Sequence, residues 1–437
     1  MYDMKKFPMF FAVLAAALPV FTSCEENGGP EATYEISVNL MYEGSAYEEE
    51  GITVSLSVFN GGASYEAATN ASGTASFCVP AGTYEASASF RTAEDGNVLT
   101  FNGVNSSVVV TASGETSFDI ALTASETNQI VIKELYIGGC PTDDGSDYYQ
   151  YDKYVVLYNN SSESATLANL CLGMATPYNS NGTNNYYEGG SLIYSDWIPA
   201  ACAIWWFQQD VTIEPYSQIV VALNGAIDHT ATYSNSVDLS NSAYYATYDP
   251  ECGFTNANYY PAPSAAIPTD HYLQSYLYGR GNAWPLSNTS PAFFIFSTEG
   301  TTPEAFAQDP SNKYQYSSAL TDAKVPVEWI IDGVEVFRSG YDNNQKRLLA
   351  SVDAGSVTLT GRLGYSVYRN VDKEATEALF ENEGLLVYNY AGGTDGSTDP
   401  SGIDAEASIA AGAHIVYKDT NNASNDFHQR ARASLRR

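Results

Sequence analysis

The stretch YDKYVVLYNNSSESATLANLCLG, residues 151–173, decides the fold class of this chain. Residues 154–158 alternate as a β-strand should, and NNSSES supplies the residues of a turn. The segment after the turn returns as a second strand with apolar side chains available for a core, namely Leu167, Leu170 and Leu172. Asparagines tolerate turn geometry and bond to nearby backbone, which favours a structural role over ligand contact. The stretch therefore predicts part of a β-sandwich that carries no chemistry of its own.

Short alternating strands also fill the preceding part of the chain, residues 33–125. Segments such as YEISVNL, GITVSLSV and SFDIALT alternate with period two and are separated by turn residues, which is typical of a small β-sandwich. A polar segment, SETNQ, then separates this region from a new β-branched run at residues 130–137. We therefore expect a first β domain at residues 33–125 and a larger one at residues 128–427.

The first domain contains a more specific pattern, YEAATNASGTASFCVPAGTYEASASF, at residues 65–90. Gly73 and Gly82 allow tight reversals, Pro80 presets a turn, and Tyr84 begins the next strand. This order of strands and turns resembles carboxypeptidase regulatory-like and prealbumin-like domains. The resemblance implies a prealbumin-like β-sandwich that serves as a spacer or adhesive unit and has no active site.

The larger domain resembles two known groups. The strand and leucine-rich return of the opening stretch are similar to the lamin-tail-like, immunoglobulin-like sandwich. The segments VALNGAIDHT, AWPLSNTSPAFFIFS, WIIDGVEVF and DTNNASNDF resemble, in this order, an uncharacterised family of Bacteroidota outer-membrane lipoproteins. That family has no established reaction, and its members resemble accessory lipoproteins of TonB-dependent receptors. The resemblance implies a mainly β fold with long loops and a TonB-dependent receptor as partner.

The C-terminal segment AHIVYKDTNNASNDF is predicted to form the closing strand and turn of the large domain. Residues 428–437 are predicted to be a mobile basic tail, because they contain Arg430, Arg432, Arg436 and Arg437.

The N-terminal residues have the pattern of an export signal. Lys5 and Lys6 precede the apolar run FPMFFAVLAAALPVF, and FTSC ends it with small residues before Cys24. The run is too short for a membrane-spanning helix. FTSC resembles the lipobox of bacterial lipoproteins, which implies a signal peptide at residues 1–23, lipidation of Cys24 and an acidic tether at residues 24–32. The tether resembles surface-export signals, so we expect lipid attachment at the outer membrane, facing outward.

Composition narrows the range of partners. The chain has 437 residues with 51 acidic and 19 basic side chains, and its formal net charge is −32. Such a surface repels phosphate backbones, so nucleic-acid binding is not expected. Besides Cys24, the chain has five cysteines, namely Cys78, Cys140, Cys171, Cys202 and Cys252. They show no CxxC spacing, so a zinc site is not indicated. They could form one or two disulfides, or they could be buried free thiols.

Catalytic motifs are missing from the sequence. The four histidines do not form HExxH, and no GxSxG elbow, phosphate loop or dinucleotide fingerprint occurs. We therefore expect no enzymatic activity, no catalytic residues and no cofactor. His229 in AIDHT, with Asp228 and Asp238 near it in sequence, is a candidate ligand-binding residue. The alternative is a ring that bonds backbone or carboxylate and fixes a turn.

Two acidic turns are candidates for calcium, because carboxylates around flexible glycines suit this ion. PTDDGSDYYQYD offers Asp143, Asp144, Asp147 and Asp152, and GTDGSTDPSGID offers Asp395, Asp399 and Asp404. Neither matches the twelve-residue loop that closes with a glutamate, so ordinary solvated loops are the alternative.

Long loops rich in tyrosine are the main candidates for ligand binding. Tyrosine offers a stacking face and a hydroxyl with few rotatable bonds, which suits recognition surfaces. The predicted ligand-binding residues are Tyr186, Tyr187, Trp197, Tyr244, Tyr245, Tyr259 and Tyr260. The alternative is that these rings only pack the loops onto the sandwich. Within CAIWWFQQD, at least alternate rings of Trp205, Trp206 and Phe207 should lie in the core.

The sequence thus predicts a surface-exposed, lipid-anchored, mainly β protein that binds a ligand or partner beside a TonB-dependent transporter. A structural or adhesive cell-surface protein is the first alternative. An extracellular glycan hydrolase is the second, although its carboxylate pair cannot be chosen among 51 acidic residues.

Overall fold

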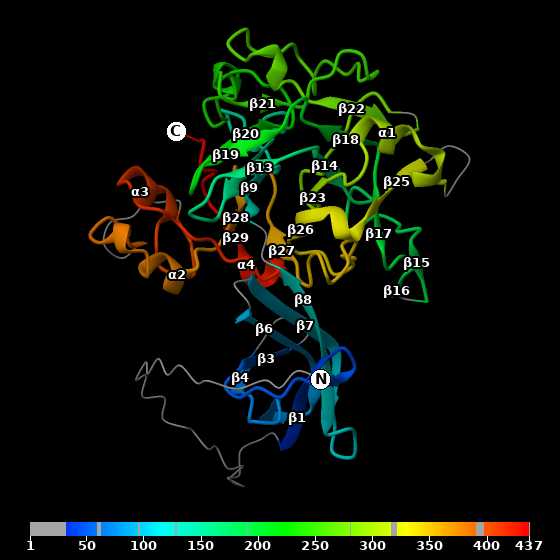
Figure 1. Cartoon of the computed structure of the whole chain (residues 1–437), viewed down its shortest axis with the longest axis vertical. Helices are drawn as coiled ribbons and strands as arrows, with labels where there is room; N and C mark the ends of the chain where they lie inside the picture. The colour runs from blue at the N-terminus through cyan, green and yellow to red at the C-terminus, as the bar shows by residue number, and fades with distance from the viewer. Residues whose placement is uncertain are drawn as a thin grey trace, which may run out of the picture. The chain divides into compact units, whose positions relative to one another are not determined.

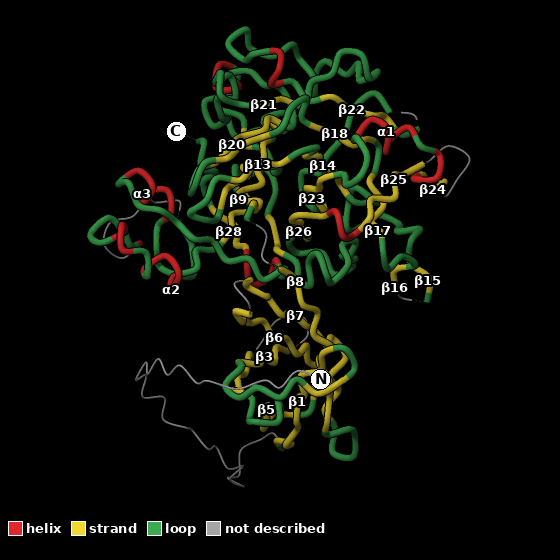
Figure 2. The backbone as a smooth tube through the Cα atoms, viewed as in Figure 1, coloured by secondary structure: helices red, strands yellow, loops and turns green. Residues whose placement is uncertain are grey.

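The computed structural model describes residues 32–58, 63–94, 97–126, 129–189, 191–279, 281–315, 321–389 and 397–436. The predicted signal peptide and Cys24 lie outside the described residues. Strands far outnumber helices, and long loops connect them (Figures 1 and 2), which confirms the predicted mainly β class. The chain divides into two compact units, of which the second contains Ala121–Arg437 together with Tyr42–Ser45 and Ser87–Val104. The predicted boundaries at residues 33–125 and 128–427 remain predictions.

The N-terminal strands are β1 (Thr33–Tyr42), β2 (Ser45–Ala46), β3 (Thr53–Val58), β4 (Ser64–Ala68), β5 (Thr74–Pro80), β6 (Gly82–Glu94), β7 (Asn97–Val110) and β8 (Ser117–Glu126). They form a sheet in the order β2-β1-β8-β7-β6-β3-β4, and β5 pairs with β1. Every second side chain of β1 is buried, as the alternating sequence predicts. Tyr84 is buried in β6, and its hydroxyl donates a hydrogen bond to the Pro80 carbonyl at 2.8 Å.

Two six-stranded sheets form the framework of the second unit (Figure 1). The first has the order β21-β20-β12-β9-β28-β29 and the second β22-β18-β14-β23-β26-β27. The first sheet consists of β9 (Ile130–Tyr136), β12 (Tyr154–Asn159), β20 (Gln218–Ala222), β21 (Tyr245–Ala246), β28 (Ser366–Arg369) and β29 (Phe427–Arg430). The second consists of β14 (Leu170–Met174), β18 (Ala203–Trp206), β22 (Gln274–Leu277), β23 (Ala292–Ser297), β26 (Ile330–Arg338) and β27 (Val357–Leu359).

Alternate side chains from both sheets meet in one apolar core. Val155 and Leu157 of β12 share this core with Leu170 and Leu172 of β14 and with Trp205 of β18. The opposite faces of the strands are covered as well, so nearly every residue of β9, β12 and β14 is buried. Such double coverage makes a strand apolar on both faces, and burial of this apolar area is the main driving force for the fold.

The opening stretch crosses from one sheet to the other. β12 pairs with β9 and β20, whereas β14 pairs with β18 and β23, so its two long strands are not partners of each other. Between them, β13 (Ala165–Leu167) pairs with β19 (Val211–Ile213). The Asn159 amide donates to the carbonyls of Glu163 and Ile213 at 2.7 and 2.8 Å. The predicted structural role of the asparagines in this turn is confirmed.

Shorter elements decorate the second unit. The small strands are β10 (Cys140–Pro141), β11 (Tyr148–Tyr149), β15 (Tyr187–Glu188), β16 (Ser191–Leu192), β17 (Trp197–Ala200), β24 (Lys313–Gln315) and β25 (Thr321–Pro326). The 3-10 helices are η1 (His229–Ala231), η2 (Thr269–His271), η3 (Pro310–Asn312), η4 (Val327–Trp329) and η5 (Phe380–Asn382), and the α-helices are α1 (Pro303–Gln308), α2 (Lys373–Glu377), α3 (Ala405–Ala410) and α4 (Ala423–Asp426). Among the described residues, no helix has the length and apolarity to cross a membrane.

The C-terminal segment corrects the prediction of a mobile basic tail. β29 continues to Arg430 and pairs with β28, and Arg430 is 4% exposed. The fully buried carboxylate of Glu134 accepts hydrogen bonds from the Ser434 backbone N–H at 2.9 Å and from the Ser434 hydroxyl. A buried charge needs such donors, so the segment is held in place although its composition is basic. The predicted closing strand at Ile415 and Tyr417 is instead buried coil with a single bridge to Val371.

The segment DTNNASNDF has a structural purpose. Arg369 is buried, and its guanidinium pairs with Asp332, with Asp419 at 3.2 Å and with Asp426 at 3.9 Å. Asp426 also accepts hydrogen bonds from Thr420 and Asn422. The acidic residues near the C-terminus therefore help to neutralise the charge of the buried Arg369.

Candidate functional site

Sheet topology brings four separate segments together at one edge of the second sheet. β14 and β26 both run antiparallel to β23, so their C-terminal ends lie beside the start of β23. β27 runs parallel to β26, with Leu359 opposite Arg338. The chain segments that follow β14, β26 and β27 and precede β23 therefore meet at the same edge.

These segments line a cavity of about 440 Å3, here named the Arg338–Arg362 pocket. Its lining consists of Asn179 and Asn181, Asn288 and Thr289, Arg338 and Ser339, and residues 359–362. Ligand sites in proteins commonly have volumes of roughly 300–1,000 Å3. The cavity thus has the size of a small-ligand site, with amides, hydroxyls and two guanidinium groups in its wall.

Both arginines of the pocket are fixed at their backbones. The Arg338 N–H donates to Asn344 Oδ1 at 3.2 Å, and Asn344 Nδ2 donates to the Arg338 carbonyl at 3.1 Å. The Arg362 N–H donates to the Gly138 carbonyl at 2.8 Å, and Arg362 has a φ of 72°. A left-handed conformation is costly for a side chain other than glycine, so the surrounding contacts must hold this turn.

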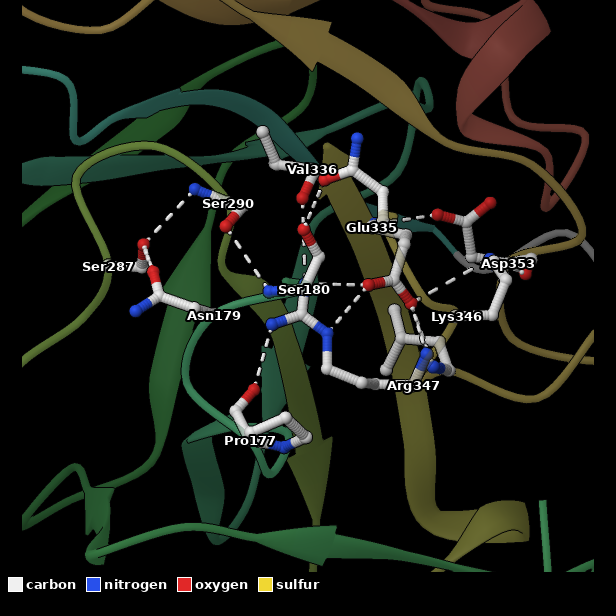
Figure 3. Close-up of polar contacts among 12 residues, drawn as sticks. Pro177, Asn179, Ser180, Ser287, Ser290, Glu335, Val336, Lys346, Arg347 and Asp353 are labelled. Atoms are coloured by element: carbon white, nitrogen blue, oxygen red, sulfur yellow. Dashed lines mark hydrogen bonds and ion pairs between the residues drawn. The ribbon is translucent and has the colours of Figure 1, made fainter. Parts of the chain in front are cut away.

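A buried ion pair between Glu335 and Arg347 is bonded to the start of the segment that carries Asn179 (Figure 3). Glu335 and Arg347 are both 0% exposed, and Arg347 Nη2 lies 2.7 Å from Glu335 Oε1. Arg347 Nη1 donates to the Pro177 carbonyl at 2.8 Å, which ties the start of the 177–181 segment to β26. Further along, the Ser180 N–H donates to the Ser290 carbonyl at 3.1 Å. The segment that carries Asn179 and Asn181 is therefore attached to rigid strands.

Tyrosines lie beside the pocket. The guanidinium carbon of Arg362 lies 4.1 Å from the centroid of the Tyr148 ring. Tyr151 packs edge-on against Tyr259 with 5.0 Å between ring centroids. Burial raises the pKa of Tyr259, and the nearby hydroxyls of Tyr151, Tyr148 and Tyr178 raise it further. Because Tyr178 is 49% exposed, part of this group of rings faces solvent.

The pocket lining offers hydrogen-bonding and cationic side chains. None of the described residues that line it carries a carboxylate, a histidine or a cysteine. Glycoside hydrolysis commonly uses a pair of carboxyl groups, and acid–base catalysis needs a titratable group near the substrate. The amides of Asn179 and Asn288 can both donate and accept hydrogen bonds, so they match ligand hydroxyls.

The first group of predicted binding residues is mostly packed into the protein. Tyr186 is 0% exposed, and its hydroxyl donates to Asp322 Oδ2 at 2.7 Å. Its ring packs against Tyr194, Trp197 and Tyr314 at centroid distances of 5.4–5.9 Å. The half-buried Tyr187 donates to the Lys346 carbonyl at 2.9 Å. This loop folds back and pairs the Tyr186 hydroxyl with a buried carboxylate, which matches the alternative that the rings pack the loop onto the sandwich.

The second group is divided between core and surface. Tyr260 is 9% exposed, stacks on Phe254 and accepts a hydrogen bond from the Trp284 N–H at 2.8 Å, so it also matches the packing alternative. Tyr245 stacks on His271 with 4.3 Å between centroids, and Tyr244 is half-buried. Only Tyr259, through Tyr151, belongs to the rings beside the pocket.

His229 is buried, and both ring nitrogens have partners. Nδ1 lies 2.8 Å from the Tyr149 hydroxyl, and Nε2 faces the Gly225 carbonyl. Burial lowers the pKa of His229, which favours the neutral ring with Nε2–H as donor. These contacts match the structural alternative, a ring that fixes a turn.

The carboxylates of the described candidate calcium ligands accept hydrogen bonds from protein groups. Asp143 accepts from the Ser234 N–H, Asp144 from the Thr142 hydroxyl, and Asp147 from the Tyr148 N–H. The hydrogen bond from Thr142, followed by those from Ser146, lowers the pKa of Asp144 to about 2.

In the other acidic turn, Asp399 accepts from the Val371 N–H at 2.9 Å and Asp404 caps α3, while Asp395 lies outside the described residues. Across the described parts of the chain, no group of three or more histidine, cysteine, aspartate or glutamate side chains is arranged to hold a metal ion. Free thiols occur at Cys140, Cys171, Cys202 and Cys252.

A second cavity, of about 620 Å3, is lined by residues between Glu377 and Tyr388, including Phe380 with 87% exposure. All of its lining comes from one local segment. The Arg338–Arg362 pocket, assembled from four segments on rigid strands, is the better candidate for a specific site.

Sequence reasoning did not find the residues of this pocket. Arg338 follows directly after WIIDGVEVF, and Asn288 lies within AWPLSNTS, but nothing in the local pattern connects them. The one available signal was the scarcity of basic residues, 19 in the whole chain, which makes an arginine at a strand end worth examining.

Comparisons with known proteins support the fold. No curated protein matches the chain. A crystal structure of a DUF4876 family protein from Bacteroides thetaiotaomicron has 18% identity and a TM-score of 0.51, and the match covers 90% of this chain and 94% of that one. A DUF3823 family protein from Parabacteroides merdae has 11% identity and a TM-score of 0.17, with 44% of this chain and 80% of that one covered.

The family model described as "Protein of unknown function (DUF4876)" matches residues 214–387. This range includes the pocket residues that precede β23 and those at the ends of β26 and β27, but not Asn179 or Asn181. Together with the shared fold, the match confirms the predicted resemblance of this chain to an uncharacterised Bacteroidota family, DUF4876.

Proposed function

We propose that this chain is a non-catalytic binding protein of the cell surface, attached to the outer membrane through lipid on Cys24. It binds a hydroxyl-rich ligand in the Arg338–Arg362 pocket and works beside a TonB-dependent receptor. The N-terminal signal pattern supports the location, and the resemblance to receptor-associated lipoproteins supports the partner.

The observation that carries the binding function is the pocket itself. Four segments far apart in sequence form one cavity of about 440 Å3, and a fully buried ion pair is bonded to the start of one of them. A preorganised cavity with a few fixed polar groups loses little entropy when a ligand binds. The lining supplies amide and hydroxyl groups, and neighbouring tyrosines offer apolar ring faces on which sugar rings stack.

Binding is tested with the full mature chain carrying Cys24→Ser, applied to a panel of immobilised polysaccharides. Ser339→Trp fills the pocket from its exposed rim and should abolish retention. Ser311→Trp, at an exposed position that does not line the pocket, is the matched control. Equal retention of both variants would place the binding surface elsewhere and contradict the proposal.

The receptor partnership needs a separate experiment. The lipidated protein is purified from its native membrane in mild detergent, and co-purifying proteins are identified by mass spectrometry. A TonB-dependent receptor present in stoichiometric amount is expected. Recovery of the chain without such a receptor, or only as self-assembled polymers, would favour an adhesive role.

A further inference from the structure

The charge of the pocket is opposite to that of the protein. The chain has a formal net charge of −32, yet the pocket lining contains two arginines and, among its described residues, no acidic side chain. Among the described residues, no carboxylate forms an ion pair with either guanidinium, whereas Arg347 and Arg369 are both paired. Arg338 and Arg362 are also exposed to solvent, so their positive charges are available to a ligand.

The two guanidinium groups have different settings. Arg362 lies over the Tyr148 ring, an arrangement that occupies the face of the guanidinium and leaves its in-plane N–H groups for an acceptor. Arg338 stands at the end of β26, where both of its backbone groups are bonded to Asn344, and its guanidinium lies farther from a ring, 5.7 Å from the centroid of Tyr341. An arginine fork matches the geometry of carboxylate and sulfate oxygens and forms stronger hydrogen bonds than neutral donors do.

Neutral groups complete the pocket. Asn179 Oδ1 accepts a hydrogen bond from the Ser287 hydroxyl, and Asn288 Nδ2 donates to Gln150 Oε1 at 3.0 Å. These bonds orient both amides while leaving further donor and acceptor capacity on each side chain. A ligand that satisfies the whole lining therefore carries hydroxyl groups and at least one anionic group.

Building on the proposed function, we propose that the Arg338–Arg362 pocket selects an acidic saccharide. The carboxylate or sulfate of the sugar binds the guanidinium groups of Arg338 and Arg362, and the ring hydroxyls bind Asn179 and Asn288. The remainder of the acidic surface repels anions, so charge recognition is confined to this pocket; at physiological salt, charges more than about 8 Å away are largely screened.

Matched pairs of polysaccharides test the inference with the mature Cys24→Ser chain. Hyaluronan and polygalacturonate are compared with their carboxyl-reduced forms, which keep the linkage and the ring but lose the charge. Chondroitin sulfate is compared with its desulfated form, which distinguishes sulfate from carboxylate recognition. Inorganic sulfate alone is the probe for simple anion binding.

Retention of at least one acidic member is expected, with its neutralised form bound at least about tenfold more weakly, as loss of a charged hydrogen-bonded contact implies. Arg338→Gln and Arg362→Gln should each weaken binding by roughly tenfold, and added salt should weaken the wild-type interaction. Arg432→Gln, at an exposed arginine outside the pocket, should leave binding unchanged.

The other outcomes of these binding experiments each overturn a specific part of the proposal. Equal binding of the acidic and neutralised forms would overturn the acidic specificity and leave the proposed binding function standing. Inorganic sulfate that competes as well as the free oligosaccharide would reduce the pocket to an anion site and overturn the saccharide. If no polysaccharide of either form is retained, both the inference and the proposed function fail.

Discussion

Replacing Arg347 with leucine should strongly destabilise the second unit, because it removes the buried partner of the buried Glu335 carboxylate. Glu335 accepts hydrogen bonds from the backbone N–H groups of Arg347 and Leu348 at 2.8 and 2.9 Å. It also receives two bonds from the Arg347 side chain, through Nε at 2.8 Å and Nη2 at 2.7 Å. Leucine keeps the backbone donors but removes the nearer counter-charge and the bond to the Pro177 carbonyl. The cation that remains is Lys346, whose Nζ lies 3.8 Å from Glu335 Oε2.

The magnitude follows from the complete burial of both partners. Removing one member of a buried pair costs about 3–5 kcal/mol of unfolding free energy when the remaining charge has no other partner. The partly exposed Lys346 stays near Glu335, so the expected loss lies near the lower end of this range. Replacing both residues by leucine removes that charge, and such replacements are often neutral in other proteins. Here the N–H groups of Arg347 and Leu348 then lose their acceptor, which costs about 1–3 kcal/mol for each buried group. The double variant should therefore remain at least about 2 kcal/mol less stable than the wild type.

Urea unfolding followed by tryptophan fluorescence measures this unit selectively. All five tryptophans lie in it, namely Trp197, Trp205, Trp206, Trp284 and Trp329. Arg432→Leu, at an exposed arginine, is the control and should change stability by no more than about 0.5 kcal/mol. If Arg347→Leu lowers the unfolding free energy by less than about 1 kcal/mol, the reasoning that Glu335 needs its buried partner is refuted. Full wild-type stability of the double variant would refute the assignment of the backbone donors to Glu335.

Three further predictions concern other parts of the chain. Burial raises the pKa of Asp322 to about 6, so between pH 4 and pH 6 the folded state binds more protons than the unfolded state, and stability falls as pH rises through this window. The unfolding free energy of Asp322→Asn, measured relative to that of the wild type, should therefore rise by on the order of 2–3 kcal/mol from pH 4 to pH 7.5. Urea titrations that give the same difference between variant and wild type at both pH values would contradict this. Truncation after Phe427 removes most of β29 and the Ser434 groups that donate hydrogen bonds to the buried Glu134 carboxylate. Soluble folded protein should therefore be lost, or its unfolding free energy lowered by more than about 3 kcal/mol. An unchanged unfolding midpoint would show that the C-terminal segment is dispensable. Cys24→Ser should move the chain from the membrane fraction to the soluble fraction in high salt, because stable anchoring needs the attached acyl chains, and unchanged fractionation would exclude lipidation at this cysteine.

The sequence by itself determined the local features of the fold. Period-two alternation located the strands of the opening stretch. It also predicted that at least alternate rings of Trp205, Trp206 and Phe207 are buried, and all three are. The turn after Tyr158 was also readable, since Asn159 bonds to residues near it in sequence as well as to Ile213. Such features depend on backbone geometry and on neighbours a few residues away, which the sequence displays directly.

Only the tertiary structure decided which side chains are exposed and which meet. Tyr186 and Tyr260 occupy loops whose composition suits a binding surface, yet each hydroxyl found a buried partner once the loop folded back. The C-terminal arginines suggested a mobile tail, but the buried carboxylate of Glu134, from the start of the large domain, holds this segment.

The pocket shows the same limit most clearly. Asn179, Arg338 and Arg362 meet because β14, β23, β26 and β27 are neighbours in one sheet, and that order is set by long-range pairing between segments far apart in sequence. Strand periodicity fixes which face a side chain occupies, whereas strand order and direction fix which strand ends share an edge. Local patterns carry the first kind of information, and only the packing of the whole sheet supplies the second.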